Sequence, residues 1–245
     1  MVRMEFATVP DKALFKMSPT SPTAMPRFLS RLGLICLLLP AVLTLGAADQ
    51  PARKRVAFVI DDGPVPEQNA AMLALLAREH VRVTFSHVGQ NVVAHPELTK
   101  AVAEAGHEIA NHTYTHPHLK PMADAAIEKE VGNTQAAIQQ ACGQAPKWFW
   151  APFLEHDDRV DDAVRRAIGL EHFPFTKYHF IGSLDWEATT TAEQFRALTT
   201  TGIVDGTVIL MHEWPEVTLA NLPAVIAELK KQGVEFVTFS ELAGK

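Results

Sequence analysis

Short apolar runs rich in Val, Ile and Phe alternate with longer amphipathic stretches from about residue 56 to the end of the chain. The runs have the length of buried strands, and the stretches carry apolar residues at helical spacing. They predict strands at 56–60, 81–88, 107–110, 147–151, 170–173, 179–183, 207–211 and 234–239. They predict helices at 67–79, 96–105, 123–141, 158–168, 192–201 and 219–232. Five of these helices end just before a glycine, which commonly terminates a helix.

This alternation predicts an α/β fold with a parallel sheet covered by helices. Seven or eight strand–helix units suit a distorted or incomplete (β/α) barrel, and the main alternative is an open doubly wound sheet. No Gly-x-Gly-x-x-Gly follows the first strand, which disfavours a dinucleotide-binding fold. Because no linker or repeat interrupts the pattern, we expect one domain over 49–245.

The N-terminal region has a different pattern. Arg27 and Arg31 precede an apolar stretch at 32–45, and small residues follow at 46–48. This order predicts a signal peptide at 25–48, since the stretch is shorter than the roughly 20 residues of a spanning helix. Residues 1–24 have no periodicity and are expected to be a disordered upstream extension. The protein is therefore expected to be exported, periplasmic or extracellular, and anchored in the membrane only if the signal stays uncleaved.

Composition changes this picture little. The 245 residues are 47% hydrophobic and carry a net charge of −6, with no basic run in the body of the chain. This argues against nucleic acid as a partner and, after signal cleavage, against stable membrane association. Cys36 lies in the predicted signal, so Cys142 would be left alone and no intrachain disulfide is expected.

Polar residues follow the predicted strands where reactive groups gather in parallel α/β folds. The first strand is followed by Asp61 and Asp62, and the last strand but one by His212. Other strand ends carry two histidines, His112 and His116, an acid–aromatic pair, Asp185 and Trp186, and an apolar segment with Trp150, Pro152 and Phe153. Together these strand ends predict one active site.

The acidic pair and the histidines suggest a metal site. Adjacent carboxylates repel each other unless a cation or proton separates them, although Asp61–Asp62 could also be a solvated turn. His112 and His116, four residues apart, can converge on one ion, and one added carboxylate leaves open positions for water and substrate. We expect one divalent ion, with zinc first and cobalt, nickel or manganese as alternatives.

Three motifs carry a family resemblance. They are Val59-Ile60-Asp61-Asp62-Gly63-Pro64, His112-Thr113-Tyr114-Thr115-His116 and Leu210-Met211-His212. In this order and at this separation, the chain resembles the polysaccharide deacetylase family, the NodB-homology domain of carbohydrate esterase family 4. The resemblance covers roughly residues 55–242 and implies a distorted (β/α) barrel that removes acetyl groups from an N-acetylated glycan.

The resemblance also implies residue roles. Asp61 would be the general base, Asp62, His112 and His116 the metal ligands, and His212 the general acid. Leu210 would help form the pocket for the acetyl methyl group. We further expect Asp185 to orient His212 or raise its pKa. Substrate contacts are expected from Trp150, Pro152, Phe153 and Trp186, with the tryptophans stacking on a sugar face.

Two positions depart from the family pattern. Trp150 replaces an arginine that contacts the catalytic Asp and keeps it ionised and oriented, and a tryptophan is expected to do neither. Gly182 replaces an aspartate. These changes leave two other functions open. One is a same-fold amidohydrolase or esterase acting on another acyl group or a non-sugar amide, and the other is a non-catalytic saccharide-binding protein.

Overall fold

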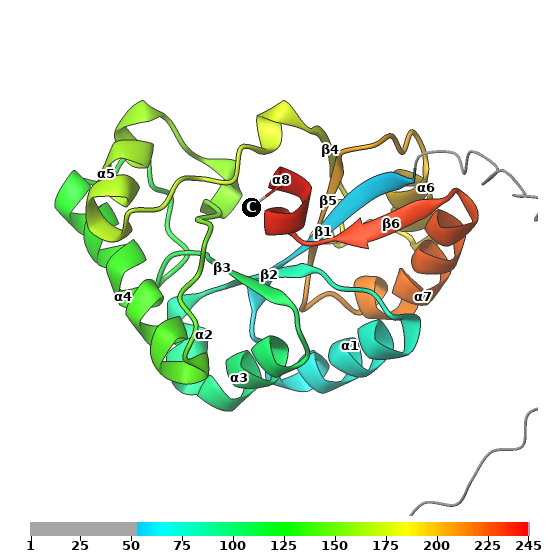
Figure 1. Cartoon of the computed structure of the whole chain (residues 1–245), viewed down its shortest axis with the longest axis horizontal. Coiled ribbons are helices and arrows are strands. Elements are labelled where there is room, and N and C mark those ends of the chain that lie inside the picture. The colour runs from blue at the N-terminus through cyan, green and yellow to red at the C-terminus, as the bar shows by residue number, and fades with distance from the viewer. Residues whose placement is uncertain (1–52, 245) are drawn as a thin grey trace, which may run out of the picture. The chain divides into compact units, whose positions relative to one another are not determined.

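The computed structural model describes residues 53–244, which form a six-stranded parallel sheet with helices around it (Figure 1). The α/β class is thus confirmed. The strands are β1 (Lys54–Gly63), β2 (Thr84–His87), β3 (Glu108–Asn111), β4 (His179–Gly182), β5 (Thr207–His212) and β6 (Val234–Val237). The helices are α1 (Pro66–Glu79), α2 (Gly89–Ala94), α3 (Pro96–Glu104), α4 (Asp124–Cys142), α5 (Asp158–Ile168), α6 (Ala192–Thr200), α7 (Glu216–Lys231) and α8 (Phe239–Ala243). The expected extension at 1–24 and signal peptide at 25–48 lie outside the described residues.

Strand β1 lies in the middle of the sheet and separates two apolar cores. Val56, Phe58 and Ile60 pack with residues of α1 and α7 in the first core. Ala57 and Val59 face the second core, because side chains alternate along a strand. Burial on both faces explains why 56–60 is a continuous apolar run. Asp61 and Asp62 therefore lie at the carboxyl end of a strand that is buried on both faces.

The sheet does not close into a full barrel. On one side, β5 pairs with β1 along 56–61. On the other side, β6 pairs with the start of β1 and β2 with its end, giving the order β3-β2-β1-β5-β4 with β6 beside β1. The second core is covered by α8 and by an aromatic segment around Trp148 and Phe173. This covering favours the incomplete barrel over the doubly wound alternative.

Two predicted strands, 147–151 and 170–173, are wrong as regular strands. Only single bridges form there, from Asn111 to Phe149 and from Phe149 to His172. Prolines at 146, 152 and 174 bound both segments, and proline cannot donate to a sheet ladder. The two bridges nevertheless extend the curved sheet beyond β3. Both segments therefore occupy the places in the barrel where strands were predicted.

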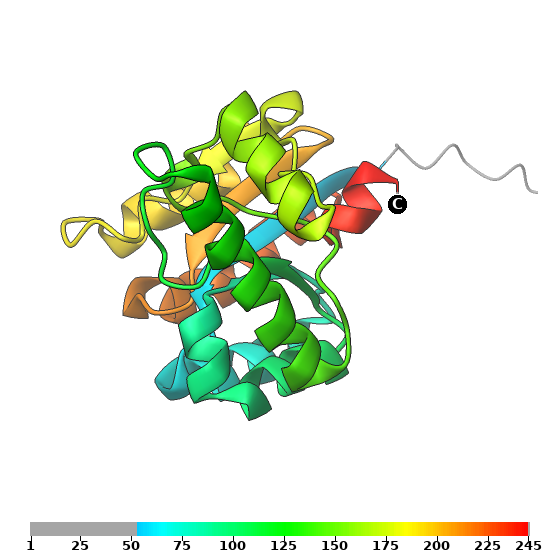
Figure 2. The ribbon, with the colours of Figure 1, turned by 90° about the vertical axis from the view of Figure 1, so that its left-hand side faces the viewer.

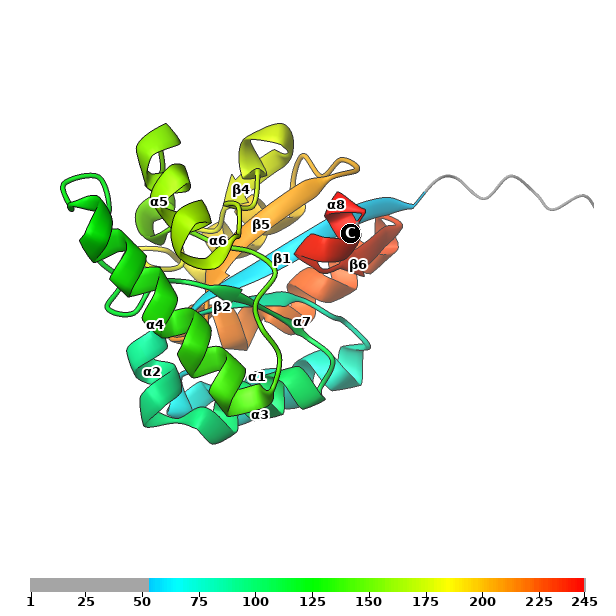
Figure 3. The same cartoon turned by 60° about the vertical axis from the view of Figure 1, so that its left-hand side comes forward.

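Helices α2 and α8 were not predicted. Helix α8 begins at a capping box in which Thr238 and Glu241 bond to each other's backbone N–H groups. Its Phe239 and Leu242 join the second core, and Figure 3 shows α8 on the face of the sheet opposite α1 and α7. A third apolar cluster joins α4 to α5, which lie side by side in Figure 2. No helix within 53–244 is both long and apolar enough to cross a membrane.

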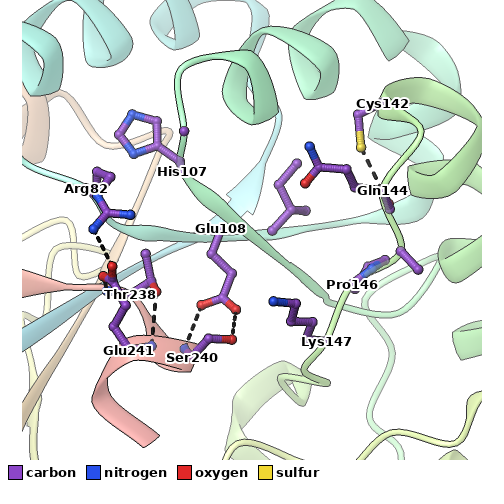
Figure 4. A pocket seen from close by; sticks show the side chains of 13 residues that line it. Arg82, His107, Glu108, Cys142, Gln144, Pro146, Lys147, Thr238, Ser240 and Glu241 are labelled. Carbon is purple, nitrogen blue, oxygen red and sulfur yellow. Dashed lines mark hydrogen bonds and ion pairs between the residues drawn. The ribbon is translucent and has the colours of Figure 1, made fainter. Parts of the chain in front are cut away.

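A polar cavity of about 290 Å³ lies at the amino end of β3 (Figure 4). On its floor, Glu108 accepts hydrogen bonds from Thr84 Oγ1 at 3.1 Å and from the backbone N–H and hydroxyl of Ser240. Arg82 pairs with Glu241 beside it. The carboxylates of Glu108 and Glu241 thus already have partners within the protein. Their contacts link α8 to β2 and β3.

Candidate active site

Three of the predicted ligands converge at the carboxyl ends of β1 and β3. Asp62 Oδ1 lies 3.5 Å from His112 Nε2 and 3.3 Å from His116 Nε2. The three residues form the one group of three or more His, Cys, Asp or Glu side chains within 53–244 whose ligand atoms lie within 4.8 Å of one another. Tetrahedral zinc with bonds of about 2.0–2.1 Å would separate its ligands by about 3.4 Å. The spacing therefore suits a single divalent ion.

The hydrogen bonds around these ligands also fit a metal. Asp62 Oδ1 is buried and has no hydrogen-bond partner among the described residues. His112 is almost fully buried, and its Nδ1 lies 2.7 Å from the carbonyl oxygen of Trp150. Because a carbonyl only accepts, Nδ1 carries a hydrogen, so the neutral form of the ring has its lone pair on Nε2, directed at Asp62. The residues at this site therefore fit a bound cation.

Glu130 on α4 holds the loop that carries both histidines. Its carboxylate accepts the backbone N–H groups of Tyr114 and Thr115 at 2.8 and 2.7 Å and the Thr115 hydroxyl at 3.0 Å. The loop includes Thr113 and His116 in the left-handed region, with φ of 62° and 56°. Such backbone angles persist only where surrounding contacts impose them, and Glu130 supplies three of those contacts.

Asp61 is buried beside the metal group. Ser86 Oγ donates to its Oδ1 at 2.5 Å, and Trp150 Nε1 donates to its Oδ2 at 2.8 Å. Burial raises the pKa of the Asp61 carboxyl, with His112 and His212 acting against this. The expectation that Trp150 could not contact the catalytic Asp is wrong, because the indole N–H reaches the carboxylate directly.

The pKa of Asp62 is shifted in the opposite direction to that of Asp61. Burial alone would raise its pKa, but His112, His212 and His116 hold that pKa well below its usual range. The carboxylate is therefore ionised under all ordinary conditions. Its Oδ2 accepts a hydrogen bond from Trp214 Nε1 at 3.0 Å, which leaves Oδ1 facing the two histidines.

Sequence reasoning missed Trp214. It lies two residues after His212, just beyond the end of β5. At this strand end only His212 was predicted to be functional. Its carbonyl oxygen accepts a hydrogen bond from the Gln68 side chain, and its side chain is 44% exposed. Trp214 therefore both holds a predicted metal ligand and presents an indole face to solvent.

His212 and Asp185 form the predicted pair. His212 Nδ1 lies 2.8 Å from Asp185 Oδ1, while Asp185 Oδ2 accepts from the His212 backbone N–H at 2.7 Å and from Thr218 Oγ1 at 2.5 Å. Burial would lower the pKa of His212, but Asp185 and Asp61 raise it overall. Burial would raise the pKa of Asp185, but the bonds from His212 and Thr218 lower it. The pairing thus favours the protonated form of His212.

These groups open into one cavity of about 430 Å³. Its apolar walls include three predicted substrate contacts, Phe153, Trp186 and Leu210, and also Trp214. Trp186 packs edge-on against His212 at 5.3 Å between ring centroids. Two other predicted contacts do not line it: Trp150 is 0% exposed, and Pro152 is also buried. The prediction that Trp150 stacks on a sugar face is therefore wrong, because its ring lies inside the core.

Glu213, next to His212, is a buried acid that sequence reasoning did not single out. It is 0% exposed, accepts from Asn69 Nδ2 at 2.8 Å and from Val65 N at 3.2 Å, and has a pKa raised by burial to about 7. In the unfolded chain the pKa is near 4.5. The folded state therefore binds the proton more tightly, and stability that is fully present below pH 4.5 is lost as pH rises through 7.

We therefore expect Glu213→Gln to remove this pH dependence. Relative to wild type, the variant should gain about 3 kcal/mol at pH 8 and little at pH 4.5. The new amide can donate to Asn69 Oδ1, which is buried without a partner. Urea unfolding at both pH values measures the difference, with the exposed Glu216→Gln as control. An equal change at both pH values would refute the assignment of Glu213 as a neutral acid.

Comparisons with known proteins agree with this geometry. The family model described as polysaccharide deacetylase matches residues 48–171. A peptidoglycan-N-acetylglucosamine deacetylase of Listeria monocytogenes is 31% identical over 192 residues, which is 78% of this chain and 39% of that protein. The chain thus spans well under half the length of that relative.

Two solved structures share the fold. A family 4 acetyl xylan esterase from Clostridium thermocellum, in complex with a cobalt ion, is 34% identical with a TM-score of 0.69, covering 78% of this chain and 91% of that one. A family 4 carbohydrate esterase from Streptomyces lividans, in complex with acetate, is 31% identical with a TM-score of 0.67, covering 74% and 90%. The predicted deacetylase-type barrel is confirmed, and the chain belongs to the polysaccharide deacetylase family.

Proposed function

We propose that this chain is an exported, metal-dependent hydrolase that removes N-acetyl groups from the sugars of a polysaccharide or oligosaccharide. The observation that carries the proposal is the meeting of a buried carboxylate, a metal-binding group and a His–Asp pair at one cavity. The Listeria relative is named for the same chemistry on peptidoglycan. Peptidoglycan, chitin-like oligomers and exopolysaccharide are all candidate substrates.

Asp62, His112 and His116 would hold the ion. Imidazole and carboxylate ligands suit zinc first, with cobalt, nickel and manganese as alternatives. A divalent ion bound there would polarise the acetyl carbonyl and lower the pKa of a water. The cobalt in the Clostridium thermocellum structure supports a divalent ion in this family.

The chain's own residues would carry the proton transfers. Asp61 takes a proton from the water as its oxygen bonds to the acetyl carbon. His212, held by Asp185, donates a proton to the sugar nitrogen as the C–N bond breaks. Acetate and a free amine leave, Asp61 gives up its proton to solvent, and His212 takes a proton back from solvent, which restores both groups. The two groups lie side by side on one face of the sheet, because Asp61 and His212 are paired in register on β1 and β5.

Substrate binding would use the apolar walls of the cavity. Phe153, Trp186 and Trp214 are 54%, 37% and 44% exposed, so each can present a ring face or edge to a sugar. Leu210 lines the same cavity and would contact the acetyl methyl group. The absence of lysine and arginine from the described lining suits an uncharged acetylated sugar at the reacting position.

A second candidate is an esterase or amidase of the same fold that acts on another acyl group or a non-sugar amide. The name of the acetyl xylan esterase, which specifies an ester substrate, favours it. A non-catalytic saccharide-binding protein is the third candidate. The complete set of base, ligands and acid argues against it.

Acetate release by residues 49–245 tests the proposal. The substrates are N-acetylglucosamine oligomers and peptidoglycan, with added zinc or cobalt and a chelator control. Chelator-sensitive release would establish the deacetylase. A protein that binds one metal ion but releases nothing would favour the second candidate, to be tested on a panel of esters and amides. A protein that binds no metal would favour the binding protein.

Export rests on the pattern at 25–48 and has its own test. N-terminal sequencing of the native protein should find a start near residue 49. An intact Met1 or Val2 would overturn both the signal peptide and the idea that 1–24 is an upstream extension.

A further inference from the structure

Trp150 connects the predicted base to a predicted metal ligand. Its indole N–H donates to Asp61 Oδ2 at 2.8 Å, and its backbone carbonyl accepts from His112 Nδ1 at 2.7 Å. One residue thus fixes the carboxylate through its side chain and the imidazole through its main chain. Asp61 and His112 come from different strands, β1 and the end of β3, and their facing atoms lie 3.8 Å apart.

The position of Trp150 is itself tightly fixed. The side chain is 0% exposed and its ring lies 5.2 to 5.5 Å from those of His172, Phe175 and Phe239. Its backbone N–H donates to the carbonyl of Asn111 at 2.9 Å. A flat ring packed on these sides has no alternative rotamer that keeps the contacts. The indole N–H is therefore aimed at Asp61 before any substrate arrives.

Both side-chain hydrogen bonds to the Asp61 carboxylate come from uncharged donors. Ser86 Oγ occupies Oδ1 and Trp150 Nε1 occupies Oδ2, and no lysine or arginine in 53–244 bonds to either oxygen. A carboxylate has about four lone-pair sites. Two neutral bonds fix its plane and leave the remaining sites for an attacking water at the cavity.

From these contacts we infer that Trp150 is a positioning residue, which orients Asp61 for proton transfer in place of the arginine that the family resemblance leads one to expect. The expected effect of Trp150 on the reaction rate rests on the proposed function. It excludes a substrate contact by Trp150, since the ring does not line the cavity. It also explains how the chain can keep the base aligned without an arginine at this position.

The test replaces Trp150 with benzothienylalanine, which keeps the ring shape and substitutes sulfur for the N–H, and with phenylalanine. Loss of an outer-shell hydrogen bond should lower kcat about 10- to 100-fold. KM should change less than about twofold and one metal ion should still bind, because the His112 bond comes from the backbone. The matched control is Trp148, which is 2% exposed and donates to Ser240 Oγ at 3.1 Å, away from the cavity.

Two outcomes would overturn the inference. One is a Trp150 variant with the kcat of the equivalent Trp148 variant, and the other is a raised KM with unchanged kcat, which would mean contact with the sugar. If wild type itself releases no acetate, the proposed function fails, and NMR still decides the inference. The Trp150 indole proton resonance should then move in Asp61→Ala while that of Trp148 stays, and an unmoved Trp150 resonance would refute the bond.

Discussion

Replacing His116 by alanine should abolish stoichiometric metal binding and, with it, acetate release. Asp62 Oδ1 and two imidazole nitrogens are the three proposed protein ligands at the site, and removing one leaves two. Removal of an outer-shell partner already costs about 10–100-fold in metal affinity, so a lost ligand should cost more than about 100-fold. Calorimetric titration of the metal-free protein with zinc measures the affinity directly.

His118→Ala is the matched control. His118 lies two residues further along the same loop, is exposed, and contacts Glu155 Oε1 at 3.1 Å and the Phe153 ring at 4.0 Å. It lies outside the metal-binding group. We expect this variant to bind one ion with wild-type affinity. Equal losses in the two variants would place the metal elsewhere or reveal unfolding of the whole loop.

Asp61→Asn should separate catalysis from metal binding. The amide cannot accept a proton at neutral pH, so the acetate release rate should fall about 10²- to 10⁴-fold, the usual range for a general base. Asp61 is not among the three ligands, so one zinc ion should still bind. Steady-state kinetics on an N-acetylglucosamine oligomer and zinc titration of the same preparation give both numbers.

Asp205→Asn serves as control for Asp61→Asn. Its side chain is 57% exposed and pairs with Arg55 at the other end of β1. It should keep the wild-type rate. If Asp61→Asn also kept its rate, the base would have to be another group. A loss of metal in Asp61→Asn would instead make Asp61 a ligand, contrary to the proposed roles.

The functional residues at the strand ends could be predicted from the sequence because each directly follows a recognisable apolar run. Asp61–Asp62 follows a run buried on both faces, and His212 follows another, so topology alone brings them to one rim. Even the pairing of His212 with Asp185 followed from this rule. The two histidines four residues apart predicted a metal site with one carboxylate, whereas the choice of Asp62 as that carboxylate and Asp61 as the base came from the family resemblance.

The contacts of the tryptophans could not be predicted in the same way. Trp150 reaches Asp61 across 89 residues of sequence and Trp214 reaches Asp62 across 152, and no local pattern encodes either bond. The charge of an arginine at position 150 would predict an ion pair with a carboxylate, whereas an uncharged indole does not predict a particular partner. The strands expected at 147–151 and 170–173 were lost for a related reason. Their apolar residues fill the barrel interior, and prolines prevent a regular ladder.

Helix α8 bears on when the site can form during synthesis. Phe239 stacks on Phe173 with centroids 3.8 Å apart and touches the Trp150 ring at 5.2 Å. It follows the six strands of the described residues, so the wall behind Trp150 stays incomplete until the ribosome has released residue 239. A nascent chain that ends before α8 would carry the proposed ligands and the proposed base, yet lack the support that aligns Asp61. The aligned site would then form only once α8 has been synthesised and has packed onto the sheet.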